Sequence, residues 1–187
     1  MLLVRMRTSS ASRYAATVLS RPRFVQVGYP SLMPLPDYPK KQLGVGALFF
    51  NRAGELLLVK PTYRDTWSIP GGVVEDGESP RQGCTREVRE EIGLDVTLGP
   101  LLVVDYTSLN TAPRENLQFL FHGGVLDGDA IARIALPEAE LSAHRFATTD
   151  DALILLNPRL ARRLPHALRC IATATAVYLE DGKSPEH

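Results

Sequence analysis

Apolar positions along the chain fall into short runs separated by turn residues from residue 43 onward. Residues 44–50 form one apolar run and residues 55–60 another, with the turn sequence Asn-Arg-Ala-Gly at 51–54 between them. Runs of this length on either side of a turn predict two strands of a hairpin. Further strands are expected at residues 67–69, 95–106, 116–126 and 145–147.

Helical spacing is clearest between residues 79 and 93. Cys84, Val88 and Ile92 recur at i, i+4 and i+8, which predicts a helix with one stripe on the core. The residues at its ends suit an N-cap, a first helical position, a capping box and a left-handed C-terminus: Ser79, Pro80, Gln82 and Gly93.

The last third of the chain reads as helical. Helices are expected to begin at residues 148–151 and at Asn157-Pro158, and residues 159–178 to be helical with an interruption at Pro165. Residues 181–187 should fray. We expect a solvated, basic helix face made of Arg159, Arg162, Arg163 and Arg169.

Composition divides the chain into three parts. Residues 1–41 are basic, Ser-rich and Pro-rich, which predicts a disordered extension and linker, with a transit peptide or a start at Met33 as alternatives. A globular domain is expected at 42–157, followed by a helix and tail at 158–187. The chain is 44% hydrophobic and 22% charged, as in ordinary globular proteins.

Net charge and cysteine content restrict the partners and the compartment. The formal net charge is +0, which points neither to a nucleic-acid polymer nor to an anionic membrane surface. No apolar run approaches the roughly 20 residues needed to span a bilayer. Two distant cysteines, Cys84 and Cys170, make no disulfide framework, so a cytoplasmic setting is expected.

An acidic ridge lies beside the apolar stripe of the predicted helix at 79–93. Glu87, Glu90 and Glu91 are spaced i, i+3 and i+4, so their charges repel by a few tenths of a kcal/mol per pair. A bound divalent cation with oxygen ligands would remove that repulsion. An ordinary solvated acidic helix is the alternative for these three residues taken alone.

The context of the ridge resembles the Nudix box. Gly72 is followed by five residues and Glu78, then by seven residues and the string Arg-Glu-Val-Arg-Glu-Glu-Ile-Gly-Leu at 86–94. This chain fills every fixed position of that motif. The resemblance implies an α/β fold, the Nudix-type α/β/α sandwich with a mixed β-sheet, and hydrolysis of a nucleoside diphosphate derivative of the nucleotide-sugar, ADP-ribose or nucleoside-triphosphate type.

The resemblance also implies residue roles. Mg²⁺, or Mn²⁺, would be held by Gly72, Glu87, Glu90 and Glu91. Arg86 would orient Glu87 or Glu90, and Glu78 would act through water or loop structure. The general base is left open between the box and a later loop, where the candidates in decreasing order are Glu140, Glu138 and Glu115.

The substrate-binding candidates precede the glycines. Trp67, Tyr63 and Arg64 could meet a nucleobase or a phosphate, although core packing for Trp67 and a solvated loop for the other two are the alternatives. A homodimer is compatible with the sequence. Two other functions are weighed: a catalytically silent Nudix module that senses nucleotides, and a prenyl diphosphate isomerase. The isomerase needs a catalytic cysteine, whereas Cys84 faces the core and Cys170 is expected outside the domain.

Overall fold

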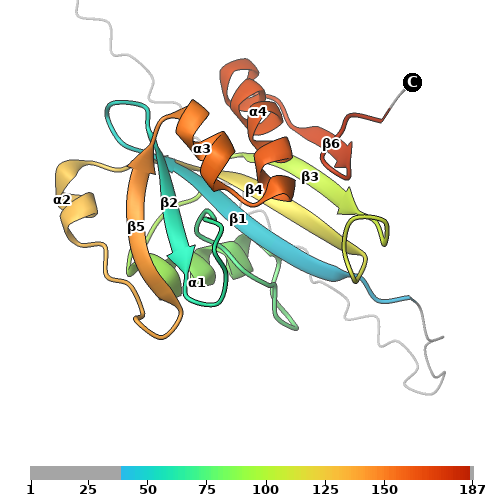
Figure 1. Ribbon diagram of the computed structural model, residues 1–187, viewed down its shortest axis with the longest axis horizontal. Helices are drawn as coiled ribbons and strands as arrows, with labels where there is room; N and C mark the ends of the chain where they lie inside the picture. Colours follow the sequence, from blue (N-terminus) through green and yellow to red (C-terminus); the bar gives the residue numbers. More distant parts are fainter. Residues whose placement is uncertain (1–38, 186–187) are drawn as a thin grey trace, which may run out of the picture. The chain divides into compact units, whose positions relative to one another are not determined.

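A mixed six-stranded sheet with strand order β5-β2-β1-β4-β3-β6 runs through the protein (Figure 1). The computed structural model describes residues 39–185, so the expected extension at 1–41 lies almost wholly outside the described residues. The strands are β1 (Gln42–Phe50), β2 (Leu56–Pro61), β3 (Leu101–Thr107), β4 (Asn116–Val125), β5 (Leu141–Ala147) and β6 (Val177–Glu180). β1 with β4 and β3 with β6 are the parallel pairs.

Helices cover both faces of this sheet, as the α/β/α expectation requires (Figure 1). α1 (Pro80–Ile92) packs on one face, and α3 (Thr149–Leu155) and α4 (Pro158–Thr173) pack on the other. The short α2 (Gly128–Ala132) lies at the β5 edge. No helix within residues 39–185 is long and apolar enough to cross a membrane.

The central strand β1 is buried on both of its faces. Val45, Ala47 and Phe49 point into the core under α1, and Leu48 points into the core under α4. Residues 44–49 of this central strand are apolar and buried because helices cover the sheet on both sides. Each fully buried large side chain contributes about 1.5–3 kcal/mol.

α1 has the boundaries that its sequence predicts. The Ser79 side chain accepts a hydrogen bond from Gln82 N, the capping box is complete, and Gly93 ends the helix with φ 71°. Cys84, Val88 and Ile92 are fully buried. The opposite flank of α1 is therefore free to present polar groups toward the loop that precedes it.

β1 and β2 separate soon after their turn, and residues 68–74 lie between them. The two strands pair only at Phe50 and Leu56. Beyond that point Ser68 pairs with β2, whereas Gly72 and Val74 form backbone hydrogen bonds with β1. The strand expected at 67–69 is thus a pair of isolated bridges, because the chain crosses from one strand to the other here.

The strand expected at 95–106 begins only at Leu101. Pro100 lacks the N–H that a ladder requires, and the preceding segment instead closes over the α1 core with Leu94 and Leu98.

The helix expected at 159–178 ends at Thr173, where Ala174 is left-handed with φ 52°. Residues 177–180 form β6 beside β3. Pro165 does not interrupt α4, since the buried Leu160, Leu164 and Ala167 hold both halves on the core.

Two further expectations for the C-terminal part are wrong. Arg163 is buried rather than solvated, and its guanidinium forms an ion pair with the fully buried Asp105. Arg163 also donates to Thr107 at 2.9 Å. The start of the segment expected to fray is fastened instead, because Gly182 N donates to Asp105 at 2.9 Å and Asp181 accepts hydrogen bonds from Ser108. Residues 186–187 of that segment lie outside the described residues.

Candidate active site

Two glycines bring the backbone at residues 71–72 close to β1 and α1. Gly71 has φ 146°, and a Cβ there would lie 2.2 Å from Val45 O. A Cβ on Gly72 would lie 2.4 Å from the carboxyl carbon of Glu87. Only glycine fits both positions without displacement, so the turn and the acidic side of α1 are in direct contact.

Two glutamates of α1 accept hydrogen bonds from this turn. Glu91 Oε2 accepts from Gly71 N at 2.8 Å, and Glu87 Oε1 accepts from Val73 N at 3.2 Å. Because the donors are backbone amides two residues apart, both carboxylates are fixed against the same short segment. Glu90 is different, with a side chain 54% exposed and no backbone donor.

Arg86 links the acidic side chains to one another. Its guanidinium donates to both carboxylate oxygens of Glu78, at 2.9 and 3.1 Å. It also donates to Glu87 at 3.0 Å and to Glu90 at 2.8 Å. A fifth bond at 2.9 Å reaches Val73 O. Arg86 thus orients both Glu87 and Glu90, and Glu78 in turn fixes Arg86.

Glu91 carries the strongest electrostatic perturbation of the ridge. Burial raises its pKa to about 7, and the charges of Glu87 and Glu140 act in the same direction. The bond from Gly71 N and the charge of Arg64 partly oppose this rise in pKa. A carboxylate in this condition gains from a proton or a cation.

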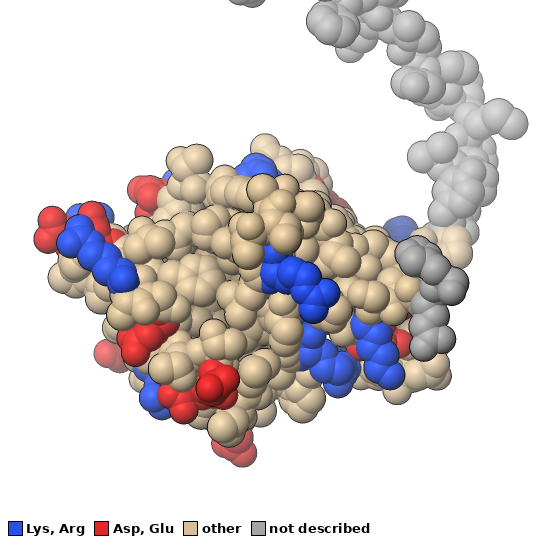
Figure 2. Space-filling model, turned by 90° about the horizontal axis from the view of Figure 1, so that it is seen from above, with Lys and Arg blue, Asp and Glu red and all other residues tan. Residues whose placement is uncertain are grey.

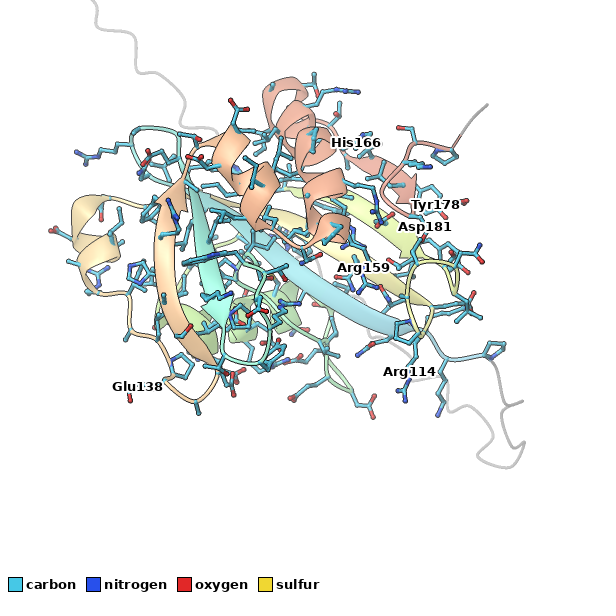
Figure 3. The ribbon with its side chains drawn as sticks, in the orientation of Figure 1. Arg114, Glu138, Arg159, His166, Tyr178 and Asp181 are labelled. Atoms are coloured by element: carbon cyan, nitrogen blue, oxygen red, sulfur yellow. The ribbon has the colours of Figure 1, made fainter. Side chains whose placement is uncertain are left out.

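The later acidic candidates lie in different places. Glu140 is near enough to raise the pKa of Glu91, and its carbonyl accepts from Thr62 N at 2.9 Å beside the end of β2. Glu138 is exposed and lies at the outer end of β5 (Figure 3). Glu115 pairs with Lys41 and accepts from the Tyr106 hydroxyl. Of the three, Glu140 is the one whose charge acts on the pKa of Glu91 in the ridge.

A cleft of about 540 Å³ opens beside the glycine turn on the α4 side of the sheet. Gly71, Gly72 and Val73 line it, so the backbone segment that holds the glutamates is also a wall of the cleft. Tyr63 and Arg64, two of the three substrate-binding candidates, line it. Trp67 does not; it packs against the α4-side core with Arg145 over its ring.

A model of the NUDIX domain matches residues 40–168 of this chain, which is more than half of its length. The chain belongs to the Nudix family. The RNA pyrophosphohydrolase of Aeromonas hydrophila is 46% identical over 57 residues, or 29% of this chain and 33% of that protein. Alignments with the curated relatives cover between 8% and 57% of those proteins' length, which is less than two thirds in every case given.

Solved Nudix structures share the fold. A UDP-X diphosphatase superposes with a TM-score of 0.63 at 22% identity, covering 79% of this chain and 71% of that one. The NUDIX domain of Shewanella oneidensis NrtR, complexed with ADP ribose, gives 0.61 at 17% identity over 75% of this chain and 94% of that one. At these identities the likeness shows the architecture alone.

The donor set of the Nudix box suits a hard divalent cation. Its groups are carboxylates and the Gly72 carbonyl, all oxygen donors of the kind that Mg²⁺ takes. Within residues 39–185 no three His, Cys, Asp or Glu side chains lie close enough together to hold a metal ion. Glu90 lies apart on Arg86, and Gly72 O accepts from Val45 N at 2.9 Å with one lone pair left. The chemistry of these donors therefore fits, and side chains of the ridge would have to move for three of them to meet one ion.

The sequence did not identify the arginines and the amide side chains that line the cleft. Arg114 and Arg159 line the cleft together with the amides of Asn116 and Gln118. Arg163 lines it as well, and its place in the apolar stripe of α4 could have marked it as buried. Arg114 lies in the β3–β4 loop, where no periodic signal could have found it.

The cysteines have structural positions. Burial raises the pKa of the Cys84 thiol to about 12 and keeps it protonated. Cys170 is buried in the core under α4, inside the fold and not outside it as expected. Neither thiol is placed for nucleophilic attack in the cleft.

Proposed function

We propose that this Nudix protein is a divalent-cation-dependent pyrophosphohydrolase that cleaves the diphosphate linkage of a nucleoside diphosphate derivative. The observation that carries the proposal is the meeting of Glu87 and Glu91 on the glycine turn that also walls the basic cleft. A diphosphate bound at this turn would face carboxylates, which repel it unless a cation lies between them.

Glu87, Glu90, Glu91 and the Gly72 carbonyl would hold Mg²⁺, with Mn²⁺ as a substitute. The bound ion would neutralise the phosphate oxygens and lower the pKa of an attacking water. Arg86 keeps Glu87 and Glu90 in place from the outer side. Glu78 would act at one remove, through Arg86.

The reaction is a displacement by water at phosphorus. The water oxygen forms a bond to one phosphorus, and the bond from that phosphorus to the bridging oxygen breaks. The bridging oxygen leaves with the second phosphate, and the water proton passes to a carboxylate. Glu87, Glu90 and Glu140 are the candidates for this base, since each lies on or beside the ridge.

The proposed substrate is a small molecule with a nucleoside on one side of the linkage. The cleft volume suits a nucleotide. Tyr63 offers a ring for stacking, and Arg64 offers a cation near Glu91. RNA, UDP-X and ADP ribose, the molecules named in the comparisons, share a nucleotide unit. Nucleotide sugars, ADP-ribose and nucleoside triphosphates are therefore proposed first, with 5′-triphosphorylated RNA as a second candidate.

The test is a substrate panel of these compounds with Mg²⁺, read by the mass of the released products. Wild type, Glu87→Gln, Glu91→Gln and Glu140→Gln are compared, with Glu138→Gln as a matched control from the same loop. We expect cleavage by wild type and by the control. Glu87→Gln and Glu91→Gln should each lose at least about a hundredfold in kcat.

Two results would overturn the proposal. One is an inert wild type on the whole panel. The other is full activity in both Glu87→Gln and Glu91→Gln. If a nucleotide binds tightly with Mg²⁺ and is recovered uncut, the alternative of a silent sensing module is favoured instead. A large loss in Glu140→Gln would assign the base to the loop rather than to α1.

A further inference from the structure

The cleft has cationic side chains at two separate ends. Arg64 lies at the end next to the glycine turn and the ridge, where its charge lowers the pKa of Glu91. Arg114 and Arg159 lie on another wall, made by the β3–β4 loop and the first turn of α4 (Figure 3). The diphosphate near the ridge accounts for Arg64 alone, so the second pair needs another explanation.

Arg114 and Arg159 are free to bind an anion. Within residues 39–185 neither forms an ion pair, and no acidic side chain lines the cleft. Arg159 uses Nη1 to donate to Thr111 O at 3.1 Å, which leaves the other donors of its guanidinium unused. The charge of Arg163, by contrast, is compensated by Asp105.

The wall that carries these arginines is fixed in place. Asp181 accepts from Ser108 N at 2.9 Å and from Ser108 Oγ at 2.7 Å, and it also accepts from Thr111. The loop between β3 and β4 is thereby tied to the segment after β6. Figure 2 shows acidic side chains mostly on one half of a face, with basic side chains on both halves.

The floor between the two ends is polar sheet surface. Asn116 pairs with Gln42 and Gln118 with Gly44, and residues paired in register point to the same face. Gln42, Asn116 and Gln118 line the cleft. Amides along such a floor suit the hydrogen-bonding edges of a base and a ribose. A nucleoside lying there would have one end at the ridge and the other near Arg114 and Arg159.

We propose that Arg114 and Arg159 form a second phosphate subsite, which binds a phosphate on the 2′ or 3′ carbon of the substrate's ribose. The proposal rests on the proposed function and narrows its substrate class to nucleoside diphosphate derivatives that carry this additional phosphate. Arginine binds phosphate through paired charge-assisted hydrogen bonds. Both a monoester, as in a phosphorylated cofactor, and the diester of an RNA 5′ end have this chemistry.

Binding of uncleavable ligands tests the subsite without depending on catalysis. The probes are adenosine 5′-monophosphate, adenosine 2′,5′- and 3′,5′-bisphosphates, and the dinucleotide pApA, each titrated calorimetrically with Mg²⁺ present. None contains a diphosphate linkage. We expect a bisphosphate or pApA to bind at least about tenfold more tightly than the monophosphate. The bisphosphates and pApA separate the monoester from the diester source.

Variants assign the gain to the two arginines. Arg114→Gln and Arg159→Gln should each reduce the gain in affinity that the additional phosphate gives over the monophosphate. The double variant should abolish this gain, while affinity for the monophosphate itself stays within about twofold. Arg169→Gln, an exposed position on the same helix, is the control and should keep the gain. Equal affinity of wild type for all four probes overturns the proposal, as does a gain that survives the double variant. Hydrolysis of the substrate panel is a separate readout, so the proposed function can fail while the subsite stands.

Discussion

Gly72 and Arg86 set the geometry of the site at the scale of single residues. Gly72 lets the Glu87 carboxylate approach the turn, and Arg86 spans Glu78, Glu87 and Glu90. A side chain on the glycine or a shorter cation at 86 would change the same thing, namely where the carboxylate oxygens stand.

Substituting Gly72 tests whether that approach matters. In Gly72→Ala the new Cβ meets the Glu87 carboxylate at about the 2.4 Å found for an ideal Cβ, so Glu87 must move. A displacement of about 1 Å costs roughly a hundredfold in rate, and we expect a loss of that size in kcat. Gly128→Ala, where an added Cβ meets nothing within 4 Å, is the control. Equal steady-state kinetics for the two variants would show that the contact is unimportant.

Glu91 predicts a pH dependence of stability in the metal-free protein. Its pKa lies at about 7 in the folded state, above the ordinary 4.5. Protonation therefore favours folding: the contribution is complete below about pH 4.5 and is lost as the pH rises through 7. In EDTA, the free energy of unfolding from urea titrations should fall across this window by at most about 3 kcal/mol more in wild type than in Glu91→Gln. Glu138→Gln should follow wild type, and parallel curves for wild type and Glu91→Gln would contradict this.

The C-terminal strand β6 matters at the scale of elements because it leads into the residue that ties the cleft wall. Asp181 adopts φ 52° after β6 and holds Ser108 and Thr111, which precede Arg114 in the β3–β4 loop. The sequence suggested helix and frayed tail here, since Arg159 to Thr173 is amphipathic and continues into apolar residues. The strand forms because β3 offers an open parallel edge, a long-range partner that local periodicity does not reveal.

Loosening this tie should affect binding more than chemistry. Asp181→Asn tolerates the left-handed backbone but loses the charge that its three donors bond to. We expect a loss of about 1–2 kcal/mol in stability. KM should rise several-fold with kcat nearly unchanged, because the groups at the reacting phosphorus stay in place. The exposed Glu180→Gln serves as control. A fall in kcat at constant KM would assign Asp181 a different role.

At the scale of the whole molecule, the acids and the cleft come from opposite faces of the sheet. α1 supplies the glutamates from one face, and the cleft lies under α4 on the other. They meet where β1 and β2 separate and residues 68–74 fill the gap. The ridge and the turn could be predicted because motif and helix capping are local. The positions of Arg114 and Arg159 could not be predicted, because these residues come to line one cleft only when β4, β3 and α4 assemble.

Cation binding at the ridge is the property from which the proposed hydrolysis follows. Titration of Mn²⁺ into the metal-free protein, followed by the loss of the free-ion electron paramagnetic resonance signal, measures that binding. We expect wild type to bind Mn²⁺ with displacement by Mg²⁺, and Glu87→Gln combined with Glu91→Gln to lose the binding while remaining folded. Absence of Mn²⁺ binding in folded wild type, or equal binding in the double variant, would contradict the account.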